Sequence, residues 1–444
     1  MTLSGPAGGV PPRGEDGSLR RILRDLLRPT DLKKAVSAYL GGNLVSTASR
    51  AISGLLVARL AGPGYMGLFL GLSVAIPYAR LLHLGVQNGT GRELPMLLGA
   101  GRREEALGVL SATWWWVTRT SALLVLAFAA AGAALGLAGR GDTAVAFAAY
   151  AVIIPLTFMN ETLEITYRTA NDFIRLSRIR ILDAVFALAS VALLLLHPWW
   201  GLLGRAILLL LLHHTLLRLW CSLPVRGRWD RPHFLQVVKI GLPMFAVGYL
   251  LGIFNVLDRT LILKFLGTDA LGLYTPALMV SMAVLVLPTS IAQVFYPRMC
   301  LEYGRTGSGR PLLRLALVPQ GLLAVGLLPL FAAGWFLMDP FVRWMLPQYV
   351  GGIPAAQWML VFIYFQCLTI PHLLFNVFHR MAALAILTVS SLAVGGGASW
   401  LFLGLGLGLQ GVPMGCALGA LWYSLAGTAW TTHMALKSPA GPAL

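Results

Sequence analysis

Charged residues are scarce in this chain, and their scarcity excludes an ordinary soluble domain. Only 11% of the 444 residues are charged and 57% are hydrophobic, whereas a soluble domain carries about 25% charged residues. Apolar runs of about 20 residues, the length at which a helix crosses the hydrocarbon of a bilayer, recur along nearly the whole chain. The composition therefore predicts an all-α polytopic membrane protein.

Motifs for catalysis and for metal binding are also missing. The four cysteines lie far apart, which argues against a disulfide framework and a cysteine-ligated metal cluster. The sequence has no P-loop, H-E-x-x-H, G-x-S-x-G or C-x-x-C motif, and GRTGSGRP (304–311) lacks the Lys-Ser/Thr ending of a P-loop. The Pro/Gly-rich start of the chain lacks the apolar core of a cleavable signal peptide. We therefore expect no enzyme activity, cofactor, bound metal or signal peptide.

Hydropathy and charge together predict the membrane topology. The connections that follow the even-numbered spans are rich in arginine, whereas those that follow the odd-numbered spans are nearly bare, with Arg59 and Arg205 at span ends. Because basic residues near span ends stay on the cytoplasmic side, both termini are expected in the cytoplasm. The net charge of +17 is then explained by topology and by attraction to anionic lipids, not by nucleic acid. The twelve predicted spans lie at 35–60, 65–86, 112–138, 143–163, 180–198, 201–221, 238–263, 269–295, 313–337, 354–377, 382–405 and 410–433.

The segment SLRRILRDLLRP (18–29) predicts one further element ahead of the first span. Its leucines and isoleucine fall on one helical face with arginines around them, and a proline ends it. A basic amphipathic helix of this kind lies on the inner leaflet of a membrane. A solvated charged helix is the alternative.

Two stretches of similar sequence lie 205 positions apart, ARLAGPGYMGLFLG (58–71) and LKFLGTDALGLYTP (263–276). Gly62 corresponds to Gly267 and Gly67 to Gly272. Each stretch falls at the outer end of a span and the turn into the next, where a short turn requires a positive φ or a close approach of backbones. The offset equals six spans, so both copies have the same orientation in the membrane.

The repeat predicts two pseudo-symmetric six-helix lobes around a central cleft. Transporters built from two parallel halves bind substrate between the halves and rock one half against the other. We therefore expect alternating access. The predicted parts are a cytoplasmic N-terminal segment 1–32, a first lobe 33–222, a cytoplasmic linker 223–232, a second lobe 233–436 and a tail 437–444.

These residues resemble a known family. The stretches ARLAGPGYMGLFLG, LLHLGVQNGTGRELPMLLGAGRREEA and NVLDRTLILKFLGTDALGLY are similar to polysaccharide flippases of the multidrug/oligosaccharidyl-lipid/polysaccharide exporter superfamily, over about residues 33–436. The resemblance implies a bacterial inner-membrane protein that flips a polyprenyl-pyrophosphate-linked oligosaccharide to the outer leaflet. Ala61 replaces a usual leucine, a conservative departure. Polysaccharide polymerases or glycosyltransferases are the candidate protein partners, and we expect a monomer.

Basic residues inside the predicted spans are candidates for substrate binding. An ionisable side chain in a span is costly and usually faces a protein interior or a water-filled cavity. Guanidinium groups remain charged and bind phosphate through two hydrogen bonds, as a crossing pyrophosphate requires. Ion pairs, snorkelling to the membrane surface and a tryptophan belt are the alternatives. The candidates are Arg50, Arg80, Arg119 and Arg259.

Acidic residues in the spans are few. Asp258, Glu161 and Asp183 are candidates for ion coupling, although Glu161 and Asp183 are expected near helix ends, where a structural role is the alternative. His213 and His214 are expected to be packed core residues and not a proton relay.

Two other functions compete with the flippase. An organic-cation or multidrug antiporter of the same superfamily would need acids at mid-membrane, where this sequence places Arg50. A non-transporting scaffold or glycosyltransferase subunit would need large soluble loops or metal-binding acids, and the sequence provides neither.

Overall fold

The turns at Gly62 and Gly267 divide long apolar helices that cross the molecule. We analysed a computed structural model that describes residues 31–170, 172–221, 223–284, 295–296, 298–303 and 305–437. The predicted amphipathic helix at 18–29 lies outside these residues. Both turn glycines have a positive φ, 73° and 84°, which confirms the expectation from the repeat.

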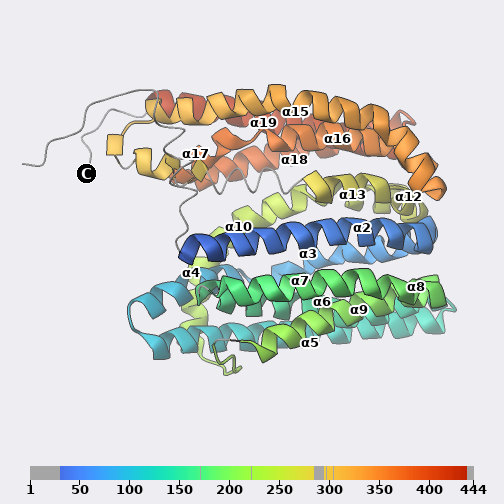
Figure 1. Cartoon of the computed structure of the whole chain (residues 1–444), viewed down its shortest axis with the longest axis horizontal. Coiled ribbons are helices and arrows are strands. Elements are labelled where there is room, and N and C mark those ends of the chain that lie inside the picture. The colour runs from blue at the N-terminus through green and yellow to red at the C-terminus, as the bar shows by residue number, and fades with distance from the viewer. Residues whose placement is uncertain are drawn as a thin grey trace, which may run out of the picture.

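Helices make up all of the regular structure in the described residues, and they run roughly along the long axis of the molecule (Figure 1). The elements before the linker are α2 (Asp31–Ser73), α3 (Ala75–Ala79), η1 (Arg80–His83), α4 (Val86–Gly99), α5 (Arg103–Leu137), α6 (Gly141–Thr169), α7 (Phe173–Ala189), η2 (Ser190–Ala192), α8 (Leu193–Leu196) and α9 (Pro198–Leu219). Those after it are α10 (Arg231–Phe254), α11 (Leu257–Phe265), α12 (Gly267–Leu273), α13 (Thr275–Val284), α15 (Arg310–Met345), η3 (Pro347–Gly352), α16 (Ile353–Cys367), η4 (Ile370–His372), α17 (Leu373–Val377), α18 (Met381–Gly404) and α19 (Gly408–Lys437).

The fold is that of a polytopic all-α membrane protein. Within the described residues, nine helical segments are long and apolar enough to cross a membrane. One of them, Ala48–His83, contains the turn at Gly62 and so joins the first two predicted spans. Helix lies at each of the twelve predicted spans, although the structure describes the eighth only as far as Val284.

The two parts of the chain occupy different sides of the bundle. In Figure 1, helices α4 to α9 lie below and helices α15 to α19 lie above, with α2, α10, α12 and α13 between them. The start of α2 and the end of α19 lie at the same end of the bundle, and we call the opposite end, which holds the turns at Gly62 and Gly267, the far end.

Buried tyrosines tie the helices together. Tyr150, Tyr167 and Tyr349 are almost completely buried, and each hydroxyl donates to a backbone carbonyl of another helix at 2.7–2.8 Å. A buried hydroxyl without a partner would cost several kcal/mol in hydrocarbon. Tyr349 donates to the carbonyl of Ala58 and thereby links η3 to α2 across the two parts of the chain.

The linker after α9 packs against α5. Trp229 packs on Trp115, with ring centroids 4.6 Å apart, and Phe234 packs on Trp116 at 4.7 Å. Asp230 caps α10 by accepting from the backbone N–H of His233 at 3.3 Å. Hydrogen bonding to the His233 side chain lowers the pKa of Asp230. The start of α10 is therefore fixed against the first part of the chain.

Glycines allow α10 to approach α4 backbone to backbone. A β-carbon added to Gly241 would overlap the carbonyl oxygen of Gly85, and one added to Gly89 would overlap the carbonyl of Val237. Small residues of this kind let membrane helices pack closely. Nearby, the Gln236 amide donates to the Glu93 carboxylate at 3.1 Å.

Gly241→Ala should force α10 away from α4. We expect the free energy of unfolding to fall by about 1–3 kcal/mol, because an overpacked contact between backbones has no flexible side chain that can move aside. Thermal unfolding of the purified protein in detergent measures the change. Gly248→Ala is the matched control on the same helix, because its β-carbon would meet no atom within 4 Å. Equal melting temperatures for the two variants would contradict the close contact.

Candidate functional site

Helix α6 carries a run of polar side chains that reach three neighbouring elements. Asn160, Glu161 and Glu164 follow one another within little more than a turn, and each contacts a different neighbour. Asn160 contacts α9, Glu161 contacts η1 and Glu164 contacts α7. The first half of the bundle is thus organised around one helix with several polar faces.

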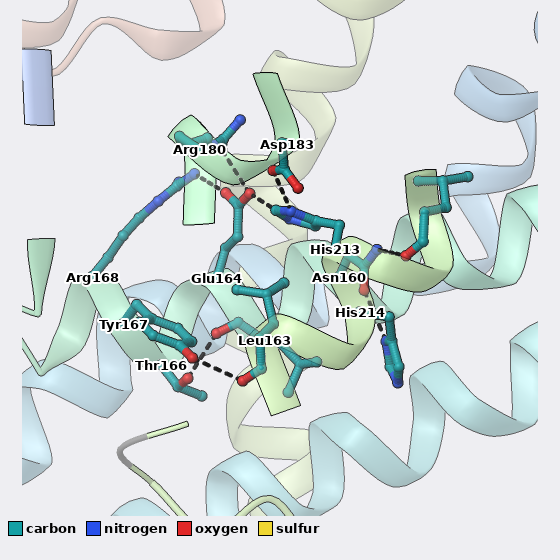
Figure 2. Close-up of polar contacts among 12 residues, drawn as sticks. Asn160, Leu163, Glu164, Thr166, Tyr167, Arg168, Arg180, Asp183, His213 and His214 are labelled. Atoms are coloured by element: carbon teal, nitrogen blue, oxygen red, sulfur yellow. Dashed lines mark hydrogen bonds and ion pairs between the residues drawn. The ribbon is translucent and has the colours of Figure 1, made fainter. Parts of the chain in front are cut away.

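The carboxylate of Glu164 lies at the centre of a charged group in Figure 2. Its Oε2 accepts from Arg168 Nη2 at 2.7 Å, one turn along α6, and its Oε1 accepts from Arg180 Nη2 of α7 at 2.6 Å. Only 12% of the Glu164 side chain and 17% of the Arg180 side chain are exposed. A carboxylate buried to this degree requires such charge-assisted partners.

His213 of α9 lies between two carboxylates. Its Nδ1 is 2.7 Å from Asp183 Oδ2, and its Nε2 is 3.4 Å from Glu164 Oε1. The imidazole can therefore hold a proton toward either acid, or carry a charge between them. We call Glu164, Arg168, Arg180, Asp183 and His213 the charged cluster.

Arg50 of α2 lies within electrostatic range of the charged cluster, namely of Arg180, Asp183 and Glu164. The guanidinium groups of Arg50, Arg168 and Arg180 thus share two carboxylates. The net charge of these five groups is positive even when His213 is neutral. Asp183 Oδ1 and Arg180 Nε are buried there without a hydrogen-bond partner among the described residues. The group therefore has unused donor and acceptor capacity.

Arg205 of α9 reaches across to helices α2 and α7. Its Nη2 donates to the hydroxyl of Ser53 and, at 3.1 Å, to the carbonyl of Ala187. It follows the start of α9 by seven residues, or about 10 Å. No carboxylate within the described residues forms a salt bridge with it.

Arg80 and Glu161 form a separate ion pair beside the charged cluster. Arg80 Nη2 is 2.5 Å from Glu161 Oε1, and the two side chains are 42% and 37% exposed. His83, on the same short helix η1, packs edge-on against Phe158 with ring centroids 4.2 Å apart. Glu161 also interacts electrostatically with Glu164, so the pair and the charged cluster are coupled.

Asp258 and Arg259 lie in the second part of the chain, far from the charged cluster in sequence. Asp258 Oδ1 accepts from the backbone N–H of Arg259 at 2.7 Å, and its Oδ2 accepts from the hydroxyl of Tyr274 at 2.9 Å. Arg259 Nη2 donates to the carbonyl of Asn255 at 3.1 Å. Both carboxylate oxygens of Asp258 are therefore already used within the fold.

Arg119 is exposed on α5, with its guanidinium 5.4 Å from the ring centroid of Trp115. Trp115 in turn packs on Trp229 of the linker. The structure thus brings Arg50 and Asp183 together, and pairs Arg80 with Glu161 and Asp258 with Arg259. Arg119 lies apart from all of them.

Three expectations from the sequence need correction. Glu161 and Asp183 do not lie at helix ends, because α6 continues to Thr169 and α7 already begins at Phe173. His213 is an ion-pair partner and not an ordinary core residue. Arg205 lies inside α9 and not at its end.

Glu164 was missed because the predicted span ended one residue before it. The signal that could have revealed it is the spacing of Glu164 and Arg168, four residues apart and suited to an ion pair on one helical face. Arg180 and His213, its other partners, come from helices distant in sequence. Within the described ranges, no group of three or more His, Cys, Asp or Glu side chains could hold a metal ion.

Glu164→Gln should destabilise the first half of the bundle. Arg180 and His213 would lose their shared counter-ion inside a buried site, and we expect a loss of about 3 kcal/mol in the free energy of unfolding. Glu161→Gln is the matched control, because its half-exposed pair with Arg80 should contribute about 0–1 kcal/mol. Thermal unfolding in detergent compares them. A larger loss for Glu161→Gln would overturn the central role of Glu164.

Comparison with solved structures shows what the fold resembles. The match to an inward-facing multidrug resistance MATE family transporter of the MOP superfamily covers 88% of this chain and 94% of that transporter, with 16% identity and a TM-score of 0.68. The match to a MOP superfamily transporter from Pyrococcus furiosus covers 93% of this chain and 97% of that transporter, with 17% identity and a TM-score of 0.63. An outward-facing MATE family transporter covers the same shares, with 17% identity and a TM-score of 0.62. At these identities the likeness shows the fold alone.

Comparison by sequence identifies the family. No curated protein matches the chain. The family model described as "Polysaccharide biosynthesis protein" matches residues 102–348, which is more than half of the chain and includes the charged cluster. This protein is therefore a member of the polysaccharide biosynthesis protein family, built on the fold of the MOP superfamily transporters.

Proposed function

We propose that this chain flips a lipid-linked, pyrophosphate-bearing oligosaccharide from the cytoplasmic to the outer leaflet by alternating access, and that it is not an enzyme. The family and the transporter fold support transport for polysaccharide biosynthesis. The substrate class is supported by the charge inside the first half of the bundle. In this proposal the protein is a monomer in a bacterial inner membrane, with both termini in the cytoplasm and the far end outside.

The guanidinium of Arg205 is the observation that carries the proposal. It lies about 10 Å along α9, and its partners in the described structure are the hydroxyl of Ser53 and the carbonyl of Ala187. An arginine in the hydrocarbon region without a carboxylate is costly. An anionic substrate that visits the site would provide the missing counter-charge.

Phosphate chemistry fits this arrangement better than an organic cation does. Arg50 and Arg180 add two guanidinium groups near the same helices, and Arg180 Nε has no partner among the described residues. Guanidinium binds phosphate through two parallel hydrogen bonds and remains charged throughout the transport cycle. Arg80, Arg119 and Arg259 could contact the sugars or the pyrophosphate only at other places.

We assign ion coupling to Asp183 and His213 of the charged cluster. His213 lies between Asp183 and Glu164, and Asp183 Oδ1 has no hydrogen-bond partner among the described residues. The charges that face this pair are those of Glu164, Arg180 and Arg50. Glu161 is paired with Arg80, and both oxygens of Asp258 are used, so these two acids are less suited to the role.

Arg205→Gln should slow flipping. Loss of one charge-assisted contact to phosphate is worth about 1.5–3 kcal/mol, or about 10- to 160-fold in rate. The assay follows a fluorescent polyprenyl-pyrophosphate oligosaccharide in proteoliposomes by its exposure to an impermeant quencher. Arg140→Gln, at the exposed turn between α5 and α6, is the matched control and should leave the rate unchanged.

Two outcomes would overturn this proposal. One is an equal rate for Arg205→Gln and wild type. The other is wild-type protein that flips no oligosaccharide but exports organic cations from the same vesicles, which would establish the antiporter instead.

A pH gradient should accelerate the wild-type protein when the outside is acidic. His213→Asn removes the group that bridges Asp183 and Glu164, so its flipping rate should no longer respond to the gradient. His379→Asn, in an exposed turn between α17 and α18, is the control. A gradient response retained in His213→Asn would remove the charged cluster from coupling.

A further inference from the structure

The two copies of the sequence repeat contact each other at the far end. A β-carbon added to Gly67 would overlap the carbonyl oxygen of Thr268 and lie 3.0 Å from the backbone nitrogen of Gly272. One added to Gly272 would overlap the carbonyl oxygen of Pro63 and lie 3.2 Å from the nitrogen of Gly67. The backbones of α2 and α12 therefore touch at these two glycines.

The contact is reciprocal in the numbering of the repeat. Thr268 lies 205 positions after Pro63, as Gly272 does after Gly67. Pro63 lies four positions before Gly67, and Thr268 lies four positions before Gly272. Gly67 faces the carbonyl of Thr268, and Gly272 faces the carbonyl of Pro63. A contact in which equivalent residues exchange the same interaction lies on a two-fold axis. The crossing therefore marks the pseudo-two-fold axis of the molecule at its far end.

Apolar packing and backbone atoms form this crossing without an ion pair. Met66 and Leu271, another equivalent pair, are both buried beside it. Tyr349 reinforces it from η3 through its bond to the carbonyl of Ala58. Among the described residues, every salt bridge lies within one part of the chain and none joins α2 to α12. Separating the two helices therefore breaks no charge pair.

We propose that the crossing of Gly67 and Gly272 is the outer gate of the transporter, the contact that closes the far end and separates when substrate leaves. The inference rests on the transport cycle proposed above. A contact on the pseudo-two-fold axis receives the same residues from both halves, so rocking the halves apart at this end must break it. Gly67 and Gly272 are then required for closing and not for opening.

Gly67→Ala and Gly272→Ala should each hold the far end open. An added methyl group can be accommodated only if α2 and α12 separate, since backbone atoms face it. The ratio of far-end-open to far-end-closed molecules should rise at least about tenfold in either variant. Gly64→Ala, in the same turn, is the matched control, because its β-carbon would meet no atom within 4 Å.

Spin-label distances measure this ratio without any substrate. Labels at Asp142→Cys and Leu405→Cys report on the far end, and labels at Arg103→Cys and Arg380→Cys report on the other end; all four sites are exposed. The partly exposed native Cys221 and Cys300 are replaced by serine, whereas Cys367 and Cys416 are buried. In both alanine variants the far-end distance should lengthen and the other distance should shorten. Gly64→Ala should resemble the wild type.

Unchanged distances in Gly67→Ala and Gly272→Ala, or the same change in Gly64→Ala, would overturn the gate. Because the readout needs no oligosaccharide, it separates the gate from the flippase. Distances that respond as expected in a protein that flips no oligosaccharide would keep the gate and overturn the proposed substrate.

A second measurement does not depend on the folding of the alanine variants. Ala61 and Asp269 line the same cavity of about 380 Å³ beside the crossing, one from each copy of the repeat. A short, reducible cross-linker between Ala61→Cys and Asp269→Cys should stop flipping, and reduction should restore it. Undiminished flipping by the cross-linked protein would overturn the gate, because transport would then not require the crossing to open.

Discussion

The hydrocarbon of the membrane imposes the constraint on which the rest of this structure depends: each polar group inside a span needs a partner within the protein. In the first half, the carboxylate of Glu164 meets this need for Arg168, Arg180 and His213 at once. Helices α6, α7 and α9 are therefore held in one arrangement by charge as well as by packing. Arg205 differs from these cations, because its guanidinium contacts only neutral oxygen atoms in the described structure.

The two halves share a fold but differ in charge. Asn255 corresponds to Arg50 under the offset of 205, and Asp258 corresponds to Ser53. Ser53 accepts from the guanidinium of Arg205, whereas Asp258 accepts from the hydroxyl of Tyr274 and forms only a long contact with the Arg259 guanidinium, at 3.8 Å. Equivalent positions of the two halves therefore share the turns and the backbone contacts, whereas their ionisable residues differ. In the described structure, Arg50, Arg180 and Arg205 lie near one another's helices in the first half, whereas Asn255 and Asp258 occupy the positions equivalent to Arg50 and Ser53.

The sequence was sufficient to predict the features that depend on neighbouring residues. The turn glycines Gly62 and Gly267 and the helical spans follow from hydropathy and local backbone geometry. The structure has a positive φ at both glycines and helix at each predicted span, the eighth of them described as far as Val284. The charged cluster could not be predicted, because its ion pairs join helices that are distant in sequence. The apolar window of the fourth span also ends at residue 163, whereas α6 continues beyond Glu164 to Thr169. Hydropathy therefore assigns a charged residue to a loop when ion pairs inside the protein in fact keep it within a helix.

The packing of Trp229 and Phe234 on the tryptophans of α5 has a consequence for the making of the protein. Chains fold from the N-terminus as they are synthesised, so α4 and α5 are in place before α10 emerges from the ribosome. Helix α10 then finds the glycine surface of α4 and the rings of α5 already formed. The order of synthesis and these contacts together make the first half a surface on which the second half can pack as it is inserted.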